Sequence, residues 1–253
     1  MKTGVESNVG CEIAGGVCTI RFDRVEKKNA LTVAMYARIV SLLEAAAADS
    51  AIRVVLLTGA GSAFTAGNDL GDFLNAPPTD ESSPVLRMLH ILVDFEKPIV
   101  AAVNGLAIGV GTTLLLHCDL VLAAASARFQ MPFVALGLVP EGASSVVLPR
   151  MAGMAKASEL LLLGEPFDAA TAKDAGIASE IVADAELGSR ALERAAALAA
   201  KPPEALRAAK RLLREPGRRE LHDAISREAS VFRERLLSEE AREAFSAFLS
   251  RRR

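Results

Sequence analysis

The sequence contains no tryptophan and a single tyrosine, and aromatic residues make up only 4% of its 253 residues. Proteins that stack on the bases of single-stranded nucleic acid need several exposed aromatic rings. The charge is nearly balanced, with 29 Lys and Arg against 31 Asp and Glu, so the chain lacks the basic excess that attracts nucleic acid or anionic membranes. We therefore expect neither nucleic acid nor a membrane surface as the main partner.

Cysteine and histidine are scarce too, with three of each in the whole chain. Cys11, Cys18 and Cys118 form no Cys-x-x-Cys pair, and an odd number of cysteines argues against a disulfide framework. No His-Glu-x-x-His motif or other zinc-site spacing occurs. We therefore expect no metal site and a reducing compartment. Because the first ten residues lack the apolar core of a signal peptide, the cytoplasm is the expected location.

The chain also lacks an unbroken apolar run of the roughly 20 residues that a membrane-spanning helix needs. Its longest apolar tract, residues 99–125, is interrupted by glycines and by Asn104, His117 and Asp119. This pattern predicts short buried elements of a soluble core. We expect His117 to be a hydrogen-bonded core histidine, Asp119 a buried structural acid and Cys118 a small packed hydrophobe.

Hydrophobic residues make up 51% of the chain, and their spacing predicts both strands and helices. Short apolar runs predict strands at 17–22, 53–58, 99–103, 120–123 and 177–182. Helical spacing predicts helices at 32–48, 85–94, 109–116, 153–163, 168–175, 186–200, 203–214 and 218–250. The Pro- and Ser-rich segment 75–84 is expected to be a mobile loop. The sequence thus predicts an α/β protein, with a mixed core over 1–200 and a helical region over 201–253.

The C-terminal helical region carries an apolar stripe at helical spacing. Its members are Leu221, Ile225, Phe232, Leu236, Phe245 and Phe248. An isolated helix cannot bury so many large side chains by itself, and each one left in water forfeits about 1.5–3 kcal/mol. We expect the stripe either to pack on its own domain or to form a subunit interface, and the two are not exclusive.

Several common catalytic motifs are missing. The nearest approach to a serine nucleophile elbow, residues 142–146, lacks the closing glycine. Gly109-Val-Gly111 lacks the third glycine of a dinucleotide-binding loop, and no GxxxxGK[ST] phosphate loop occurs. Two other glycine-bearing loops remain, at 62–70 and 104–113, and each comes after a predicted strand. Tight turns of this kind can leave two backbone N–H groups unpaired, and two converging N–H groups form an oxyanion hole.

These two loops resemble the signature loops of the crotonase (enoyl-CoA hydratase/isomerase) superfamily. The matching segments are 28–31, 62–70, 98–119, 129–132, 136–142 and 172–178, and they follow one another in the family's order. The resemblance implies a spiral of repeated ββα units, followed by a C-terminal helical region used in trimerisation. It also implies an acyl-CoA thioester as the ligand, no cofactor, and a homotrimer or a dimer of trimers.

The resemblance further implies that the backbone N–H groups of Asn68 and Val110 hold the thioester oxygen. Removing one such donor costs roughly 3–4 kcal/mol of transition-state stabilisation. Other positions in the matching segments are expected to contact the substrate, namely Lys28, Ala30, Ala66, Gly67, Asp69, Leu70, Gly109, Phe133 and Gly142. From the residues alone, Asp69 is also a suitable cap for a short helix that starts at Leu70.

The reaction is indicated by departures from the family pattern. Hydratases of this family use two glutamates to position and activate water, and the matching positions here hold Thr113 and Phe133. Neither side chain can supply the acid or the base that hydration requires. Glu141 matches the single glutamate of the peroxisomal-type Δ3,Δ2-enoyl-CoA isomerases, which also share the Gly-Asn-Asp-Leu form of the first loop.

The sequence therefore predicts a Δ3,Δ2-enoyl-CoA isomerase of fatty-acid β-oxidation, in which Glu141 moves a proton from C2 to C4 of the acyl chain. Hydration, or another reaction on an acyl-CoA, is the alternative within the family. A protein that binds acyl-CoA without turnover is the alternative of a different class.

Overall fold

The computed structural model describes residues 8–75, 80 and 82–250. The strands are β1 (Val9–Ala14), β2 (Val17–Phe22), β3 (Val54–Gly59), β4 (Ala63–Thr65), β5 (Ile99–Val103), β6 (Leu106–Ile108), β7 (Leu120–Ala124), β8 (Arg128–Gln130), β9 (Phe167–Asp168) and β10 (Glu180–Val182). The α-helices are α1 (Val33–Ala48), α2 (Leu70–Asn75), α3 (Pro84–Asp94), α4 (Val110–Thr113), α5 (Ser144–Ser158), α6 (Ala169–Asp174), α7 (Leu187–Ala199), α8 (Pro203–Leu236) and α9 (Glu239–Ser250).

The strands form two sheets that share a repeating unit. The six-stranded sheet has the order β1-β2-β3-β5-β7-β10, and the four-stranded sheet has the order β4-β6-β8-β9. The consecutive pairs β3–β4, β5–β6 and β7–β8 each place their first strand in the large sheet and their second in the small one. β3, β5 and β7 run parallel to one another, as do β4, β6 and β8. The chain therefore climbs as a spiral of ββα turns, as expected.

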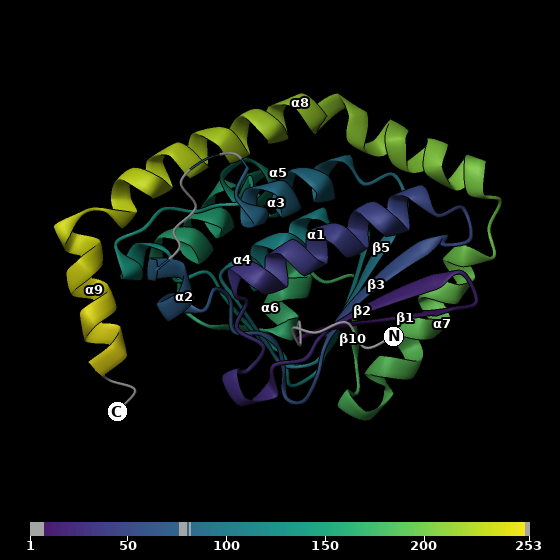
Figure 1. Cartoon of the computed structure of the whole chain (residues 1–253), viewed down its shortest axis with the longest axis horizontal. Coiled ribbons are helices and arrows are strands. Elements are labelled where there is room, and N and C mark those ends of the chain that lie inside the picture. Colours follow the sequence, from purple (N-terminus) through teal and green to yellow (C-terminus); the bar gives the residue numbers. More distant parts are fainter. Residues whose placement is uncertain (1–7, 76–79, 81, 251–253) are drawn as a thin grey trace.

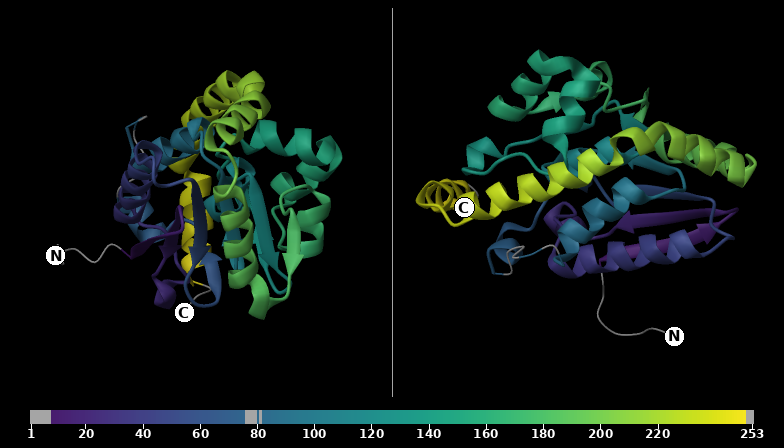
Figure 2. Two further views of the ribbon diagram at one scale, coloured as in Figure 1. Left: turned by 90° about the vertical axis from the view of Figure 1, so that its right-hand side faces the viewer. Right: turned by 90° about the horizontal axis from the view of Figure 1, so that it is seen from above.

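Helices cover the large sheet and extend beyond it. α7 packs against β3, β5 and β7, while α1 packs against β1, β2 and α3. α8 arches along one side of the molecule in Figure 1, and from above it lies between α3 on one side and α5 on the other, both of which it contacts (Figure 2). The groups carried by α8 therefore face elements that lie far apart in the sequence.

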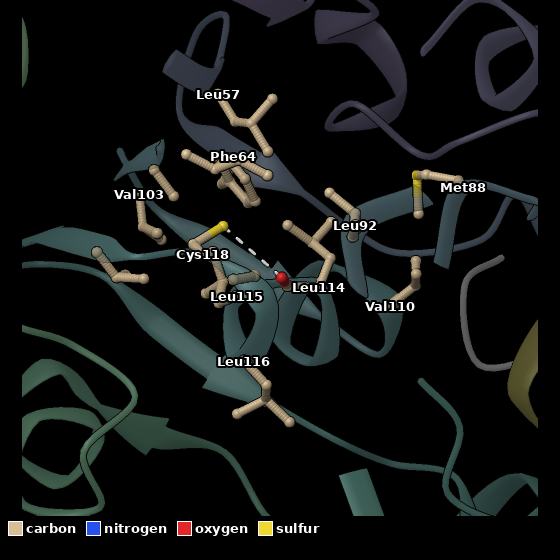
Figure 3. Packing of buried hydrophobic residues seen from close by; sticks show 14 of the residues in the cluster. Leu57, Phe64, Met88, Leu92, Val103, Val110, Leu114, Leu115, Leu116 and Cys118 are labelled. Carbon is tan, nitrogen blue, oxygen red and sulfur yellow. Dashed lines mark hydrogen bonds between the residues drawn. The ribbon is translucent and has the colours of Figure 1, made fainter. Parts of the chain in front are cut away.

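The turn after α4 fills the centre of the core. Leu114, Leu115 and Leu116 of this 3-10 turn are all buried, and Figure 3 places them among side chains of the two sheets and α3. Cys118 is buried beside them, with its Sγ 3.7 Å from the carbonyl oxygen of Leu114. The prediction of Cys118 as a small packed hydrophobe is confirmed.

Asp119 ties α8 to the large sheet. Its Oδ2 accepts hydrogen bonds from Nζ of Lys210 at 2.7 Å and from the backbone N–H of Ile99 at 2.8 Å. Lys210 lies on α8 and is itself buried. Because the buried charge of Lys210 needs a partner, this pair is structural, which confirms the structural role predicted for Asp119, although Asp119 is partly exposed and not buried as predicted.

The C-terminal helices differ from the prediction in where they break. α8 continues through Pro216, although the sequence predicts a break between 214 and 218. Proline has no N–H group, so Pro216 cannot donate a helical hydrogen bond to the carbonyl of Leu212. Leu212 is 77% exposed, and water can therefore replace the lost donor. The break comes instead after Leu236, and Oγ of Ser238 then caps α9 by accepting from the N–H of Ala241 at 3.1 Å.

The apolar stripe of the C-terminal region is buried within its own chain. Leu221, Ile225, Phe232, Leu236 and Phe245 are each at most 8% exposed, and the side chain of Phe248 lies outside the described part of the chain. Packing on the same chain therefore accounts for these five side chains. A subunit interface, if it forms, must use other surfaces.

Several short elements escape the sequence pattern. β1, β4, β6, β8 and β9 were not predicted, and four of them have only two or three residues, too few to display a period.

The predicted helix 153–163 is the end of α5, bent at Gly153, followed by a π-helical turn. Most of the mobile loop predicted at 75–84 lies outside the described residues. No described helix is long and apolar enough to span a bilayer.

Candidate active site

The two glycine-bearing loops lie against each other at one end of the small sheet. The first loop joins β4 to α2 and contains Gly67, which has a φ of +84°. A Cβ atom on Gly67 would come within 2.7 Å of the carbonyl oxygen of Ile108, in the second loop. Only glycine permits this approach of the two backbones. Asn68 comes one residue after Gly67, and Val110 comes two residues after Ile108, so both lie close in sequence to this contact between the loops.

Both of these residues present a free backbone N–H group. Within the described part of the chain, neither the N–H of Asn68 nor that of Val110 donates to a protein acceptor. Val110 is the first residue of α4, where helical N–H groups have no intrahelical partner. Gly109 before it has φ +56° and ψ −120°, a conformation that directs the chain into the helix. Each of the two loops therefore carries one unpaired backbone donor.

The segment 28–31 supports the first loop. The N–H of Ala66 donates to the carbonyl of Lys28 at 2.9 Å, and the N–H of Leu31 donates to that of Gly67 at 2.8 Å. The buried side chain of Asn29 donates to the carbonyls of Ala60 and Ala63. The match to the family in this segment therefore has a structural basis, because it fixes the backbone on either side of Asn68.

A buried tyrosine orients the side chain of Asn68. Tyr36 on α1 donates its hydroxyl to Oδ1 of Asn68, with 2.5 Å between the oxygens. Burial, together with the charge of Glu141, raises the pKa of Tyr36 well above its usual range, so that the phenol stays neutral and remains a donor. The sequence offers no local signal for this pair, whose members are 32 residues apart.

Glu141 is the carboxylate that lines the adjoining pocket. The residues that line the pocket are Asn68, Val85, Leu86, Leu89, Glu141, Gly142, Ile225, Ala229, Phe232 and Arg233. The hydroxyl of Thr113 donates to Oε1 of Glu141. Burial raises the pKa of Glu141 to about 7, the charge of Glu228 adds to the rise, and the bond from Thr113 opposes it. A carboxyl group with this pKa can take up and return a proton near neutral pH.

The loop that carries Glu141 is anchored by Glu228, which the sequence analysis missed. The buried carboxylate of Glu228 on α8 accepts from the backbone N–H of Ala143 at 2.7 Å and from that of Ser145 at 3.0 Å. These are unpaired groups at the start of α5, where a negative charge is also favoured by the helix dipole. α8 therefore fixes the entry to α5, two residues beyond Glu141.

His117 holds the same loop from the other side. Its Nε2 lies 2.8 Å from the carbonyl oxygen of Gly142, which can only accept, so Nε2 carries the hydrogen. Burial lowers the pKa of His117 to about 4, and the ring is neutral at physiological pH. The prediction of a satisfied core histidine is confirmed.

A family model described as enoyl-CoA hydratase/isomerase matches residues 12–253. The chain belongs to the enoyl-CoA hydratase/isomerase family. This result confirms the crotonase resemblance expected from the two loops, and the fold agrees with it. A crystal structure of an enoyl-CoA hydratase/isomerase from Pseudoalteromonas atlantica T6c superimposes with a TM-score of 0.92 at 41% identity, covering 96% of this chain and 97% of that one.

Relatives in this family carry out more than one reaction. Enoyl-CoA delta isomerase 2 of Homo sapiens is 38% identical over 244 residues, which are 94% of this chain and 62% of the human protein. This chain thus spans less than two thirds of that relative's length. The 2,3-dehydroadipyl-CoA hydratase of Escherichia coli (strain K12) is 36% identical over 239 residues, 93% of each chain. Membership of the enoyl-CoA hydratase/isomerase family therefore leaves isomerisation and hydration both open.

The resemblance implies that family hydratases have glutamates at the positions of residues 113 and 133. This chain has no carboxylate at either position. Thr113 is fully buried in α4, and its hydroxyl is committed to Glu141. Phe133 is also buried, and its ring edge lies 4.0 Å from the point where a Cβ on Gly109 would stand. The site therefore combines the two glycine-bearing loops with one carboxylate, Glu141, at a position different from both of these.

The other residues expected to contact the substrate divide into two groups. Ala66, Gly67, Gly109 and Gly142 lie at the loops just described, beside Asn68, Val110 and Glu141. Asp69 instead accepts from the N–H groups of Gly71 and Asp72 and pairs with Arg24 at 2.6 Å, which confirms the predicted cap of α2. The carbonyl of Ala30 accepts from Arg24, Leu70 opens α2, and the side chain of Lys28 is exposed.

Proposed function

We propose that the protein is a Δ3,Δ2-enoyl-CoA isomerase that works with one catalytic glutamate. The observation that carries the proposal is the position of Glu141, a pocket carboxylate with a pKa of about 7 beside the free N–H groups of two adjoining loops. Proton abstraction next to a thioester needs one base near neutrality and donors for the enolate oxygen. A hydratase of this family would need two carboxylates, and Thr113 and Phe133 occupy those positions.

In the proposed reaction, the thioester oxygen of a 3-enoyl-CoA accepts hydrogen bonds from the N–H groups of Asn68 and Val110. The Glu141 carboxylate removes a proton from C2, and the electron pair of the broken C–H bond is delocalised with the C3–C4 double bond into a dienolate whose oxygen carries the negative charge; the C2–C3 double bond forms when C4 is protonated. The protonated Glu141 then delivers the same proton to C4, which gives the trans-2-enoyl-CoA. Because the proton only moves between carbons of one molecule, the step needs no metal, redox group or other cofactor.

Product analysis with 3-hexenoyl-CoA tests this proposal directly. We expect a shifted double bond, seen as 2-hexenoyl-CoA by chromatography and mass spectrometry, with no gain of water. A 3-hydroxyacyl-CoA as the first product would favour hydration, and free CoA would favour thioester hydrolysis. Unchanged substrate that nevertheless binds would favour an acyl-CoA-binding protein without turnover.

Replacing Thr113 by Val should shift the pH dependence of isomerisation to higher pH. The hydroxyl stabilises the charged form of Glu141, and a hydrogen bond to a charged group contributes about 1.5–3 kcal/mol. At 1.36 kcal/mol per pKa unit, its loss should raise the midpoint of the profile by about one unit or more above 7. Rates measured from pH 5 to 10 check this shift. Thr113→Ser, which keeps the hydroxyl, should restore the original midpoint, and a midpoint unchanged in Thr113→Val would remove the bond from the mechanism.

We also propose that the protein forms a homotrimer or a dimer of trimers. The support is an apolar surface that its own chain leaves exposed, with Leu212 and Leu213 on α8 and Leu162 and Leu163 on the π-helical turn each at least 61% exposed. Closed symmetry is the usual way to bury such surfaces in soluble homo-oligomers. Light scattering at micromolar concentration should give a mass near three or six protomers, and a fully active monomer would contradict the proposal.

The cytoplasm is the location that we propose. The thiols of Cys11 and Cys18 lie on neighbouring strands with 3.3 Å between their sulfur atoms, and neither is bonded to the other. An oxidising compartment would favour a bridge between two thiols this close.

A further inference from the structure

Apart from Asn68 and Glu141, the lining of the pocket is apolar with the exception of one cationic side chain. α3 contributes Val85, Leu86 and Leu89 to its lining. α8 contributes Ile225, Ala229 and Phe232, followed by Arg233. Apolar walls of this kind suit the methylene groups of an acyl chain. A guanidinium does not, because it brings a fixed positive charge and five N–H donors into the same space.

Arg233 has no partner for this charge in the part of the chain that the structure describes. Its Nη1 atom is shielded from solvent and makes no hydrogen bond, and no carboxylate lies within ion-pair distance. Other arginines of α8 are paired, as Arg214 is with Asp119 and Arg235 with Glu240. Buried polar groups in native proteins nearly always have a partner, so an unpaired one in a binding pocket indicates that a ligand supplies the acceptor.

Glu141 is not that acceptor, although both residues line the pocket. Oε1 of Glu141 accepts from the hydroxyl of Thr113, and Nη1 of Arg233 makes no hydrogen bond to Glu141 or to any other group in the described part of the chain. This nitrogen of Arg233 is therefore available to another anion in the pocket.

We propose that Arg233 binds a carboxylate at the far end of the acyl chain, so that the substrates are enoyl-CoA thioesters of dicarboxylic acids. This inference rests on the proposed function for the placement of the thioester at Asn68 and Val110. A guanidinium holds a carboxylate through two parallel N–H···O bonds, and α3 and α8 contact the methylenes between the two ends. A chain that ends in a methyl group leaves Nη1 unpaired and is disfavoured for that reason.

Binding of saturated thioesters tests this inference without any isomerisation. Hexanedioyl-CoA and hexanoyl-CoA have the same chain length and differ in a terminal carboxylate against a methyl group, and coenzyme A alone serves as the reference. By titration calorimetry, we expect the protein to bind hexanedioyl-CoA at least tenfold more tightly than hexanoyl-CoA. Arg233→Met should remove this preference and leave binding of coenzyme A unchanged. Arg233→Lys, which keeps the charge without the planar fork, should retain part of the preference.

A matched control lies on the same helix. The side chain of Arg219 is 96% exposed and is absent from the pocket lining, so Arg219→Met should leave all three affinities unchanged. Equal binding of the two acyl-CoAs by the unmodified protein would overturn the inference. So would an Arg233→Met variant that weakens coenzyme A as much as hexanedioyl-CoA, because the guanidinium would then serve the phosphates. Failure to isomerise 3-hexenoyl-CoA and 3-hexenedioyl-CoA, with the binding preference intact, would contradict only the proposed function.

Discussion

Replacing Glu141 by Gln is expected to slow the isomerisation of 3-hexenoyl-CoA by about 10²–10⁴-fold, the usual contribution of a positioned general base. Glutamine has nearly the same shape and can still accept the hydrogen bond from Thr113, so the pocket should keep its form. Its amide cannot take up the C2 proton. Initial rates at saturating substrate, with the affinity for hexanoyl-CoA measured in parallel, separate lost chemistry from lost binding.

The pH dependence gives the same prediction a second test. Only the ionised form of Glu141 can act as the base, and its pKa is raised to about 7, so kcat/KM should rise with pH and reach half its maximum near pH 7. The residual rate of Glu141→Gln should lack this ionisation. Glu220→Gln, which changes an exposed carboxylate paired with Arg150, serves as the control and should behave as the unmodified protein. Equal rates for the unmodified protein and Glu141→Gln would remove Glu141 from the mechanism.

Replacing Gly109 by Ala should lower kcat by about 10²–10³-fold, the measured effect of losing one oxyanion-hole donor. Gly109 has φ +56° and ψ −120°, which an alanine does not adopt, so the backbone must rotate and carry the N–H of Val110 with it. Crowding is not the cause, because the nearest atom to the added Cβ is 4.0 Å away, on the ring of Phe133. Steady-state kinetics should show a loss in kcat that exceeds any change in KM.

A second glycine provides a matched control for backbone strain. Gly15, in the turn between β1 and β2, has the same φ of +56°, and an added Cβ there would meet nothing within 4 Å. A positive φ strains a residue other than glycine, so both Gly15→Ala and Gly109→Ala should lose stability in thermal unfolding. Only Gly109→Ala should lose activity. A Gly109→Ala variant with full activity would exclude the Val110 N–H as a donor.

The sequence predicts the elements that have enough residues to show a period. The apolar run 99–103 becomes β5, and Thr32 caps α1 by accepting from the N–H of Met35, as its position suggests. The strands of the small sheet have two or three residues, and no period can be seen over that length. Pro216 misleads because the helix is exposed to solvent on both sides of it, so that water can replace the lost hydrogen bond and the helix can continue.

The residues of the candidate site also divide into those that the sequence predicts and those whose role depends on the three-dimensional fold. Asn68, Val110 and Glu141 are predicted through the resemblance of the segments around them to those of the crotonase superfamily. Glu228 is 85 residues from Ala143, the backbone group that it holds, and a glutamate on an amphipathic helix looks like any solvated one. Nη1 of Arg233 is unpaired because the fold places no acceptor near it, and the sequence alone does not show which groups lie nearby.

Both proposed anion donors belong to the main chain, and this has an evolutionary consequence. Substitution of the side chains at 68 and 110 leaves an amide N–H in place, so mutation can explore these positions without erasing the ability to stabilise an enolate. Around the two proposed donors, this chain has one carboxylate, Glu141, and it has Thr113 and Phe133 at the two positions where the resemblance implies the glutamates of hydratases. A new reaction can then arise when a carboxylate appears at another position, because the main-chain donors that stabilise the enolate stay in place.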